Sequence, residues 1–180
     1  RVGNQLPILL IDFHLQGTRR PIIAWTIHRQ VTQELKTQLE HYGHTVAVYD
    51  GATPNKTRDQ IVAQFQAGQI EVLIANIVAA GVGLTLTHAS DAVFVETEWT
   101  PALVAQAEDR IHRISQTRPV TITTLVAAGT LDPIIHRILA EKIDLLDQIT
   151  PGSDHKVTTL KTDQRITQLI QSYQTPTQRR

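Results

Sequence analysis

Short apolar runs alternate with amphipathic helical patterns along this chain, and the alternation limits the folds that it can adopt. Each run is long enough for one strand, and each segment between two runs is long enough for one helix. The predicted strands are Pro21–Thr26, Thr45–Tyr49, Glu71–Ala75, Asp91–Val95 and Val120–Val126. Strands that alternate with helices favour a parallel sheet that helices cover on both faces. The sequence therefore predicts an α/β protein with a central, mostly parallel sheet.

The helices are predicted from the spacing of apolar residues and from signals at their ends. They cover about Pro7–Leu15, ended by Gly17, then His28–Tyr42, the segment after Pro54, the segment after Pro101 and a long segment after Thr130. After Pro151 the composition turns polar, and one more helix is expected around Ile166–Tyr173. We therefore expect one lobe in residues 1–149 and a polar C-terminal extension in residues 150–180.

The segment from Asn76 to Gln116 carries the candidate functional residues. It reads as a strand end, a glycine turn, a second strand, a Trp-Thr-Pro step and a helix. At about 100° per residue, an apolar stripe on that helix lies beside a polar sector of roughly 60°. The stripe consists of Leu103, Ala107, Ile111 and Ile114, and the sector of Gln106, Arg110 and Arg113. One amide and two guanidiniums so placed could bind an anion; the alternative is a solvated charged face.

Three motifs in this segment resemble a known family in their order and spacing. They are Ala80-Gly81-Val82-Gly83-Leu84-Thr85-Leu86-Thr87, Trp99-Thr100-Pro101 and the run QAEDRIHRISQ from Gln106 to Gln116. Together they resemble the second helicase lobe of the Swi2/Snf2-type DNA translocases of helicase superfamily 2, in particular the annealing-helicase branch. The resemblance implies a RecA-like lobe, that is, a three-layer sandwich like those of the P-loop NTPases.

The resemblance also implies roles in a nucleotide site. Arg113 would be the arginine finger that stabilises charge on the transferred phosphoryl group, and Arg110 would be its partner. Gln106, Gly81 and Gly83 would bind the nucleotide, the glycines by letting backbone amides approach a phosphate closely. The alternative for the arginines is an ion pair within the domain, such as Arg110 with Asp109 or Glu96.

Contacts with the DNA backbone are implied at several strand ends. Thr26 and His28 lie at the end of the first sheet strand, where the family has a phosphate-contacting motif. Gly51 with Arg58 resembles a family turn and its arginine. The complete set of DNA-binding residues implied in this way is Thr26, His28, Gly51, Arg58, Asn76, Thr85 and Trp99. Trp99 could instead pack against the surface of the domain.

Composition limits the other function classes. The formal net charge is zero, so nothing attracts nucleic acid to the chain as a whole, and weak DNA binding is expected. The absence of cysteine excludes disulfides and thiolate metal sites, and the eight histidines show no metal-ligand spacing, so no metal site is expected. There is no signal-peptide pattern and no apolar run of about 18 residues, so no membrane partner is expected.

The chain contains only half of the motifs that an ATP-driven motor needs. It has no Gly-Lys pair for a phosphate loop and no Asp-Glu pair for a magnesium-binding strand end. It begins at Arg1 without a methionine, and we expect it to be a piece of a longer protein. ATP would then bind in a cleft shared with an N-terminal RecA-like lobe of the same parent chain, which would hold Mg²⁺. The piece alone would not hydrolyse ATP.

Two other function classes stay open at this point. One is an adaptor module that binds DNA or protein without turnover. The other is a compact phosphate-binding α/β enzyme, for which His88 is the one acid/base residue near the glycine turn. The expected location is the cytoplasm (nucleoid) in a bacterium or the nucleus in a eukaryote. The motifs do not distinguish unwinding from annealing or translocation.

Overall fold

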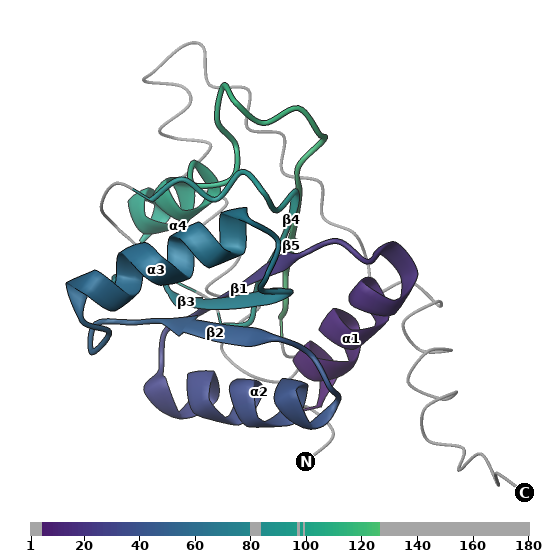
Figure 1. Ribbon diagram of the computed structural model, residues 1–180. Helices are drawn as coiled ribbons and strands as arrows, with labels where there is room; N and C mark the ends of the chain where they lie inside the picture. The colour runs from purple at the N-terminus through teal and green to yellow at the C-terminus, as the bar shows by residue number, and fades with distance from the viewer. Residues whose placement is uncertain (1–4, 80–83, 97, 99, 127–180) are drawn as a thin grey trace, which may run out of the picture. The chain divides into compact units, whose positions relative to one another are not determined.

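A single parallel sheet lies at the centre of the structure, which is a computed structural model that describes residues 5–79, 84–96, 98 and 100–126 (Figure 1). Its strands are β1 (Ile22–Thr26), β2 (Val46–Tyr49), β3 (Val72–Asn76), β4 (Asp91–Phe94) and β5 (Thr121–Thr124). The strand order is β2-β3-β1-β4-β5, and all four neighbouring pairs are parallel. Each strand falls within or next to a predicted run, so the predicted α/β architecture is confirmed.

The two middle strands are buried on both faces. All five residues of β1 are buried, as are the first four of β3. In the register, Ile22 of β1 pairs with Val72 of β3 on one side and with Asp91 of β4 on the other. A strand with neighbours on both edges and helices on both faces has no solvent side, which explains the uninterrupted apolar sequence of β1.

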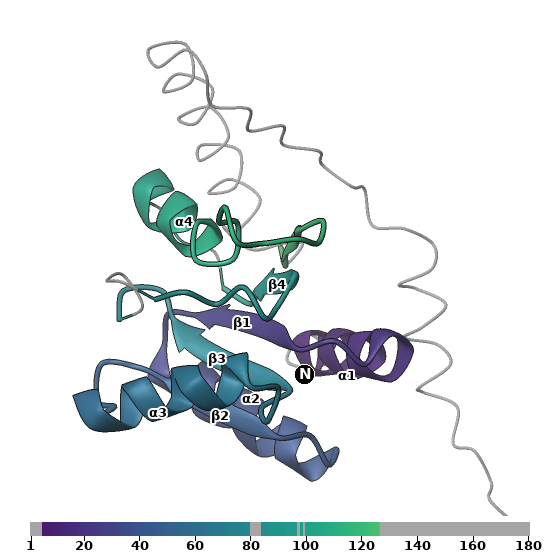
Figure 2. The ribbon, with the colours of Figure 1, turned by 45° about the horizontal axis from the view of Figure 1, so that its top comes forward.

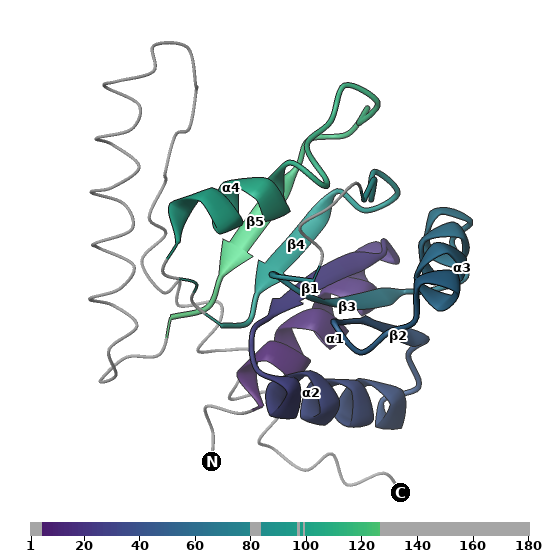
Figure 3. The ribbon, with the colours of Figure 1, turned by 90° about the vertical axis from the view of Figure 1, so that its left-hand side faces the viewer.

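Two helices cover each face of the sheet (Figures 2 and 3). The helices are α1 (Leu6–Thr18), α2 (Arg29–His41), α3 (Asn55–Gln66) and α4 (Pro101–Glu108). One core cluster joins Ile11 of α1 and Leu39 of α2 to Val93 in the sheet. The other joins Phe65 of α3 and Ala107 of α4 to Trp25. The structure is therefore a three-layer sandwich, as predicted.

The carboxyl ends of the strands are fastened to one another at one edge of the sheet. Ile77 N donates to Thr26 O at 3.0 Å, and Val95 N donates to Trp25 O at 2.9 Å. The Asn76 side-chain Nδ2 donates to Ile27 O at 2.7 Å. Because all strands are parallel, the segments that follow β1, β3 and β4 meet at this edge, which is where open α/β sheets bind ligands.

The fourth helix is shorter than predicted. It ends at Glu108, so the prediction of a helix that carries Arg110 and Arg113 is wrong. The carbonyl of Arg110 accepts a hydrogen bond from Leu86 N at 2.9 Å instead of from an amide one helical turn later. Arg110 N and Ile111 N donate to the carbonyls three residues earlier, the spacing of a 3₁₀ turn and not of an α-helix. Ile114 is consequently exposed, although the helical stripe predicted it in the core.

The first helix also ends differently. It continues through Gly17 to Thr18, and the left-handed residue after it is Arg19, with φ 53°. The Thr18 hydroxyl donates to His14 O at 2.9 Å and accepts from Arg20 N at 3.1 Å, which holds this end without a glycine.

Several predictions lie outside the described residues. They are the roles of Gly81, Gly83 and Trp99, the helix after Thr130, and the boundary and helix of the 150–180 extension. Within the described ranges, no helix combines the length and apolar character needed to cross a membrane.

Candidate functional site

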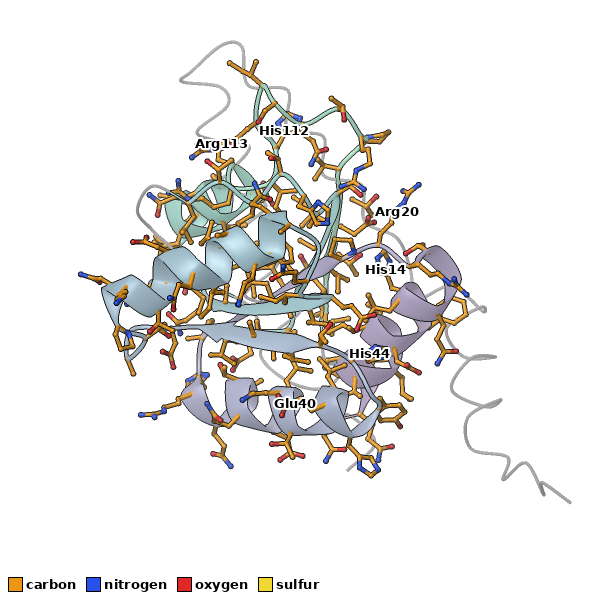
Figure 4. The ribbon with its side chains drawn as sticks, in the orientation of Figure 1. His14, Arg20, Glu40, His44, His112 and Arg113 are labelled. Atoms are coloured by element: carbon orange, nitrogen blue, oxygen red, sulfur yellow. The ribbon has the colours of Figure 1, made fainter. Side chains whose placement is uncertain are left out.

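The residues around the end of α4 line an open depression of about 770 Å³. Its lining consists of Gln106, Asp109, Arg110, His112, Arg113, Ile114 and Ser115. The amide and both guanidiniums that the sequence placed on one helix face therefore do come together, although two of them lie in the turns after the helix. Figure 4 shows Arg113 and His112 at this end of the molecule.

Arg113 joins this depression to the loop that precedes β4. The Arg113 side chain is exposed, its Nη1 donates to the Thr85 hydroxyl at 2.9 Å, and its Nε donates to Asp109 O at 3.3 Å. Neither acceptor is a carboxylate, so these contacts hold the guanidinium without neutralising it. They also use only part of its five N–H donors. Among the described residues, no carboxylate lies within ion-pair distance of Arg113. A fixed guanidinium of this kind beside an open depression suits an anionic ligand.

Arg110 is held differently. Its relative exposure is 7%, and its backbone carbonyl binds Leu86 N. The side chain lines the depression together with Gln106, which is partly buried on α4. A buried guanidinium has little freedom, so Arg110 can orient a ligand or its neighbours without a large loss of side-chain entropy.

Thr26 and Asn76 use their polar side chains within the protein. The Thr26 side chain is fully buried, and its hydroxyl lies 2.7 Å from the Thr32 hydroxyl. Asn76 bridges to Ile27 O, as noted, and its Oδ1 accepts from Val78 N at 3.1 Å and Ala79 N at 3.2 Å. The Thr26 hydroxyl is therefore used within the core, and the predicted contact between Thr26 and DNA stays a prediction. Asn76 shapes the turn after β3.

His28 is exposed at the same edge of the sheet. The exposed fraction of its side chain is 73%, and its Nδ1 lies 2.6 Å from Glu96 Oε1. The second carboxylate oxygen of Glu96 accepts from Ile27 N at 2.7 Å and from His28 N at 2.9 Å. The segment between β1 and α2 is thus held by one carboxylate that follows β4.

Gly51 and Arg58 are in direct contact. Arg58 Nη2 donates to Asp50 O at 2.9 Å and to Gly51 O at 3.3 Å. The Arg58 guanidinium carbon lies 5.2 Å from the centre of the Tyr49 ring, a distance typical of a cation–π contact. The half-buried arginine therefore braces the turn after β2, with Gly51 exposed beside it.

Gln116 is a residue whose part in the site was not predicted. Its Nε2 donates to Ala89 O at 2.7 Å and to Thr87 O at 3.2 Å, and its Oε1 accepts from Arg118 N at 3.1 Å. It thereby fixes the loop that presents Thr85 to Arg113. Its position as the last residue of the QAEDRIHRISQ run was a signal that could have identified it.

The comparison with protein families gives one clear match. Residues 5–115 match the family described as helicase conserved C-terminal domain. That range includes the sheet up to β4, all four helices, and the Arg110 and Arg113 region.

Curated relatives point the same way. The chain is 33% identical over 143 residues to a Caenorhabditis elegans protein named SWI/SNF-related matrix-associated actin-dependent regulator of chromatin subfamily A-like protein 1 homolog, covering 79% of this chain and 21% of the relative. It is 41% identical over 115 residues to the Mus musculus DNA annealing helicase and endonuclease ZRANB3, covering 63% of this chain and 11% of the relative. The chain thus spans about a tenth to a fifth of these relatives.

Among solved structures, the C-terminal part of the Fun30 ATPase domain is similar, with a TM-score of 0.68 and 22% identity. The match covers 89% of this chain and 49% of that one. This likeness concerns the fold, and it confirms the RecA-like lobe that the motifs implied.

Proposed function

Because this chain belongs to the helicase conserved C-terminal domain family, and within it to the Snf2-type proteins, we propose that it is the second motor lobe of an ATP-dependent DNA translocase or helicase. The observation that carries the proposal is the position of Arg113. Its guanidinium is exposed at the edge of the depression, held by Thr85 and Asp109 through acceptors that leave its charge uncompensated.

ATP would bind against the depression at the end of α4. Gln106, Arg110 and Arg113 offer an amide and two cationic groups there, which are donors suited to phosphate oxygens. Arg113 would act as the finger on the γ-phosphate, Arg110 as its partner, and Gly81 and Gly83 as nucleotide contacts. The phosphate loop and the Mg²⁺ ligands would come from an N-terminal lobe. Closure of the two lobes on ATP would then drive movement along DNA.

The DNA-contacting side would lie along the carboxyl edge of the sheet. His28, Arg58 and Thr85 have polar side chains there that are exposed or half-buried, and Gly51 is exposed. Asn76 would act by shaping its turn, and Trp99 would stack on DNA or on the other lobe. The curated relatives are eukaryotic proteins, and two are named for chromatin regulation or DNA annealing, so we place the parent protein in the nucleus.

The first prediction concerns ATP hydrolysis. The 180-residue chain should fold, as circular dichroism would show, but hydrolyse no ATP with or without DNA. The same chain joined to its N-terminal motor lobe should show DNA-stimulated turnover in a coupled ATPase assay. Turnover by the purified single lobe would contradict the shared site. A joined protein that binds DNA without any turnover would favour the adaptor alternative.

The second prediction concerns DNA affinity. With zero net charge, the chain alone should bind duplex DNA with a Kd of roughly 10⁻⁵ M or weaker at physiological salt, and binding should fade steeply as salt rises. In an anisotropy titration, Arg58→Ala should lower the salt slope by about one, as expected for one lost phosphate contact. Arg20→Ala, an exposed arginine beside α1, is the matched control. Tight, salt-insensitive binding would indicate a dedicated DNA-binding domain instead.

A further inference from the structure

Glu96 makes three hydrogen bonds to one short segment far away in sequence. Its Oε2 accepts from Ile27 N and His28 N at 2.7 and 2.9 Å, and its Oε1 lies 2.6 Å from His28 Nδ1. The exposed fraction of the Glu96 side chain is 18%, against 73% for His28. The Glu96 carboxylate is therefore mostly buried, and it binds a histidine whose ring is exposed to solvent.

This pairing determines which ring nitrogen of His28 can donate. A carboxylate accepts only, so the Nδ1 of His28 must carry a proton to make the bond. The other nitrogen, Nε2, then has a proton only when the ring is the imidazolium cation. In the neutral ring, Nε2 presents a lone pair, which repels a phosphate oxygen. With the Glu96 contact in place, the imidazolium form of His28 can therefore donate a hydrogen bond to a phosphate, whereas the neutral form cannot.

We propose that Glu96 is a positioning residue that makes the grip of His28 on the DNA backbone depend on protonation of the ring. The inference rests on the proposed function, in which His28 contacts a DNA phosphate. Glu96 touches neither DNA nor nucleotide. It holds the backbone at Ile27 and His28, orients the His28 ring and determines which ring nitrogen carries the proton of the neutral form.

The charged groups around His28 support this assignment. Among the described residues, Glu96 is the one carboxylate within ion-pair distance of the ring. Arg29 follows His28 on α2, and Glu98 is bound to Thr100 N at 3.0 Å. The His28 carbonyl accepts from Thr32 N and from the Thr32 hydroxyl, which fixes the start of α2 without involving the ring.

The test measures the affinity of the two-lobe protein for labelled duplex DNA by anisotropy, without nucleotide, between about pH 5 and 8, where histidine changes charge. The unaltered protein should lose about tenfold in affinity as pH rises, since one charge-assisted contact to phosphate is lost. In Glu96→Gln, the amide oxygen can still accept from the two backbone N–H groups, while the amide NH₂ donates to Nδ1. The neutral ring then carries its proton on Nε2 and can donate to a phosphate at high pH as well, so the loss of affinity with rising pH should become smaller.

Two further variants separate positioning from simple stability. His28→Ala leaves both backbone bonds of Glu96 in place and should also remove the pH dependence, with weak binding throughout. Glu40→Gln, a matched charge change near the far end of α2, should keep the pH profile of the unaltered protein (Figure 4). Circular dichroism and urea unfolding of each variant verify that it is folded. If Glu96→Gln does not fold, a His28→Ala protein that keeps the pH dependence of the unaltered protein would still overturn the proposal.

The outcomes distinguish this inference from the proposed function. A Glu96→Gln or His28→Ala protein that binds DNA with the pH dependence of the unaltered protein would overturn the role of Glu96 and leave the motor assignment intact. Failure of the unaltered two-lobe protein to bind DNA at every pH would overturn both. A smaller pH dependence in Glu96→Gln and its loss in His28→Ala, with DNA binding retained in both, is the expected result.

Discussion

Replacing Arg113 by alanine should lower DNA-stimulated ATP hydrolysis by the two-lobe protein by about 10³- to 10⁵-fold. A guanidinium beside the γ-phosphate acts mainly on charge that develops in the transition state, so its loss lowers turnover more than ground-state binding. The KM for ATP should therefore stay within a few-fold. Steady-state kinetics at saturating DNA provide both numbers.

The conservative variant sharpens this prediction. Arg113→Lys should recover little activity, because an ammonium on a flexible stem cannot reproduce a planar fork that is held by Thr85 and Asp109 O. Thr85→Ala should lower turnover less than Arg113→Ala, since it removes one anchor and keeps the guanidinium. Arg20→Ala is the matched control, since Figure 4 shows Arg20 near α1, away from Arg113.

Arg113 and Arg20 are exposed and Thr85 is half-buried, so none of these single substitutions should unfold the lobe. Circular dichroism of each protein should match that of the unaltered one. Turnover by Arg113→Ala within about tenfold of the unaltered protein would mean that the residue only ties the α4 turn to the Thr85 loop. The motor assignment would then lose its main support.

The fold could be predicted from sequence because it follows from local pattern. Each strand is a short apolar run, and burial of the middle strands on both faces requires such a run, as β1 shows with five buried residues. Alternation with helices then leaves few arrangements other than a parallel sandwich. The sequence likewise predicted correctly that Gln106, Arg110 and Arg113 lie close together.

The backbone conformation around these three residues could not be predicted from the helical spacing of the sequence. The helical projection assumed that α4 runs on to Gln116, but the helix ends at Glu108. The bond from Leu86 N to Arg110 O contributes to that end, and it joins residues from different parts of the chain. Local spacing holds no information about such a bond. The three side chains meet through a turn, where a period of 3.6 residues does not apply.

The burial of the Thr26 side chain was also not predicted. Thr26 was assigned to DNA because the family that the chain resembles has a phosphate-contacting motif at this strand end. Its partner, however, is Thr32 on the next helix, and the pair satisfies itself within the core. Glu96 was considered only as an ion-pair partner of Arg110, and no role was predicted for Gln116. Both side chains bind backbone groups of distant segments, and the sequence does not reveal such contacts.

Replacing Trp25 by alanine should destabilise the lobe by about 3–5 kcal/mol. Trp25 is fully buried in β1, and its ring lies 6.2 Å from that of Phe94 with an interplanar angle of 25°. Truncation removes this contact and leaves a cavity between the sheet and the α3 and α4 layer. Urea unfolding of the 180-residue chain, followed by circular dichroism, measures the loss as a lower midpoint at similar slope.

Trp25→Phe provides the matched control, and it should cost about 1 kcal/mol or less. Phenylalanine keeps an aromatic ring against Phe94 and suits a strand equally well. It also removes the indole Nε1–H, which is buried without a hydrogen-bond partner among the described residues. A buried donor without a partner costs about 1–3 kcal/mol, and its removal offsets most of the lost volume. Equal losses for alanine and phenylalanine would contradict the stabilising role of the ring contact between Trp25 and Phe94.

The effect of Trp25→Ala should reach the site through the backbone of β1. Trp25 O accepts the hydrogen bond from Val95 N, one residue before Glu96, and Thr26 O accepts the bond from Ile77 N, one residue after Asn76. Loosening β1 therefore releases both segments that hold Ile27 and His28. In the two-lobe protein, Trp25→Ala should weaken DNA binding even where the lobe remains folded, whereas Trp25→Phe should not. Native-like DNA affinity in a folded Trp25→Ala protein would show that the strand ends are held without this core contact.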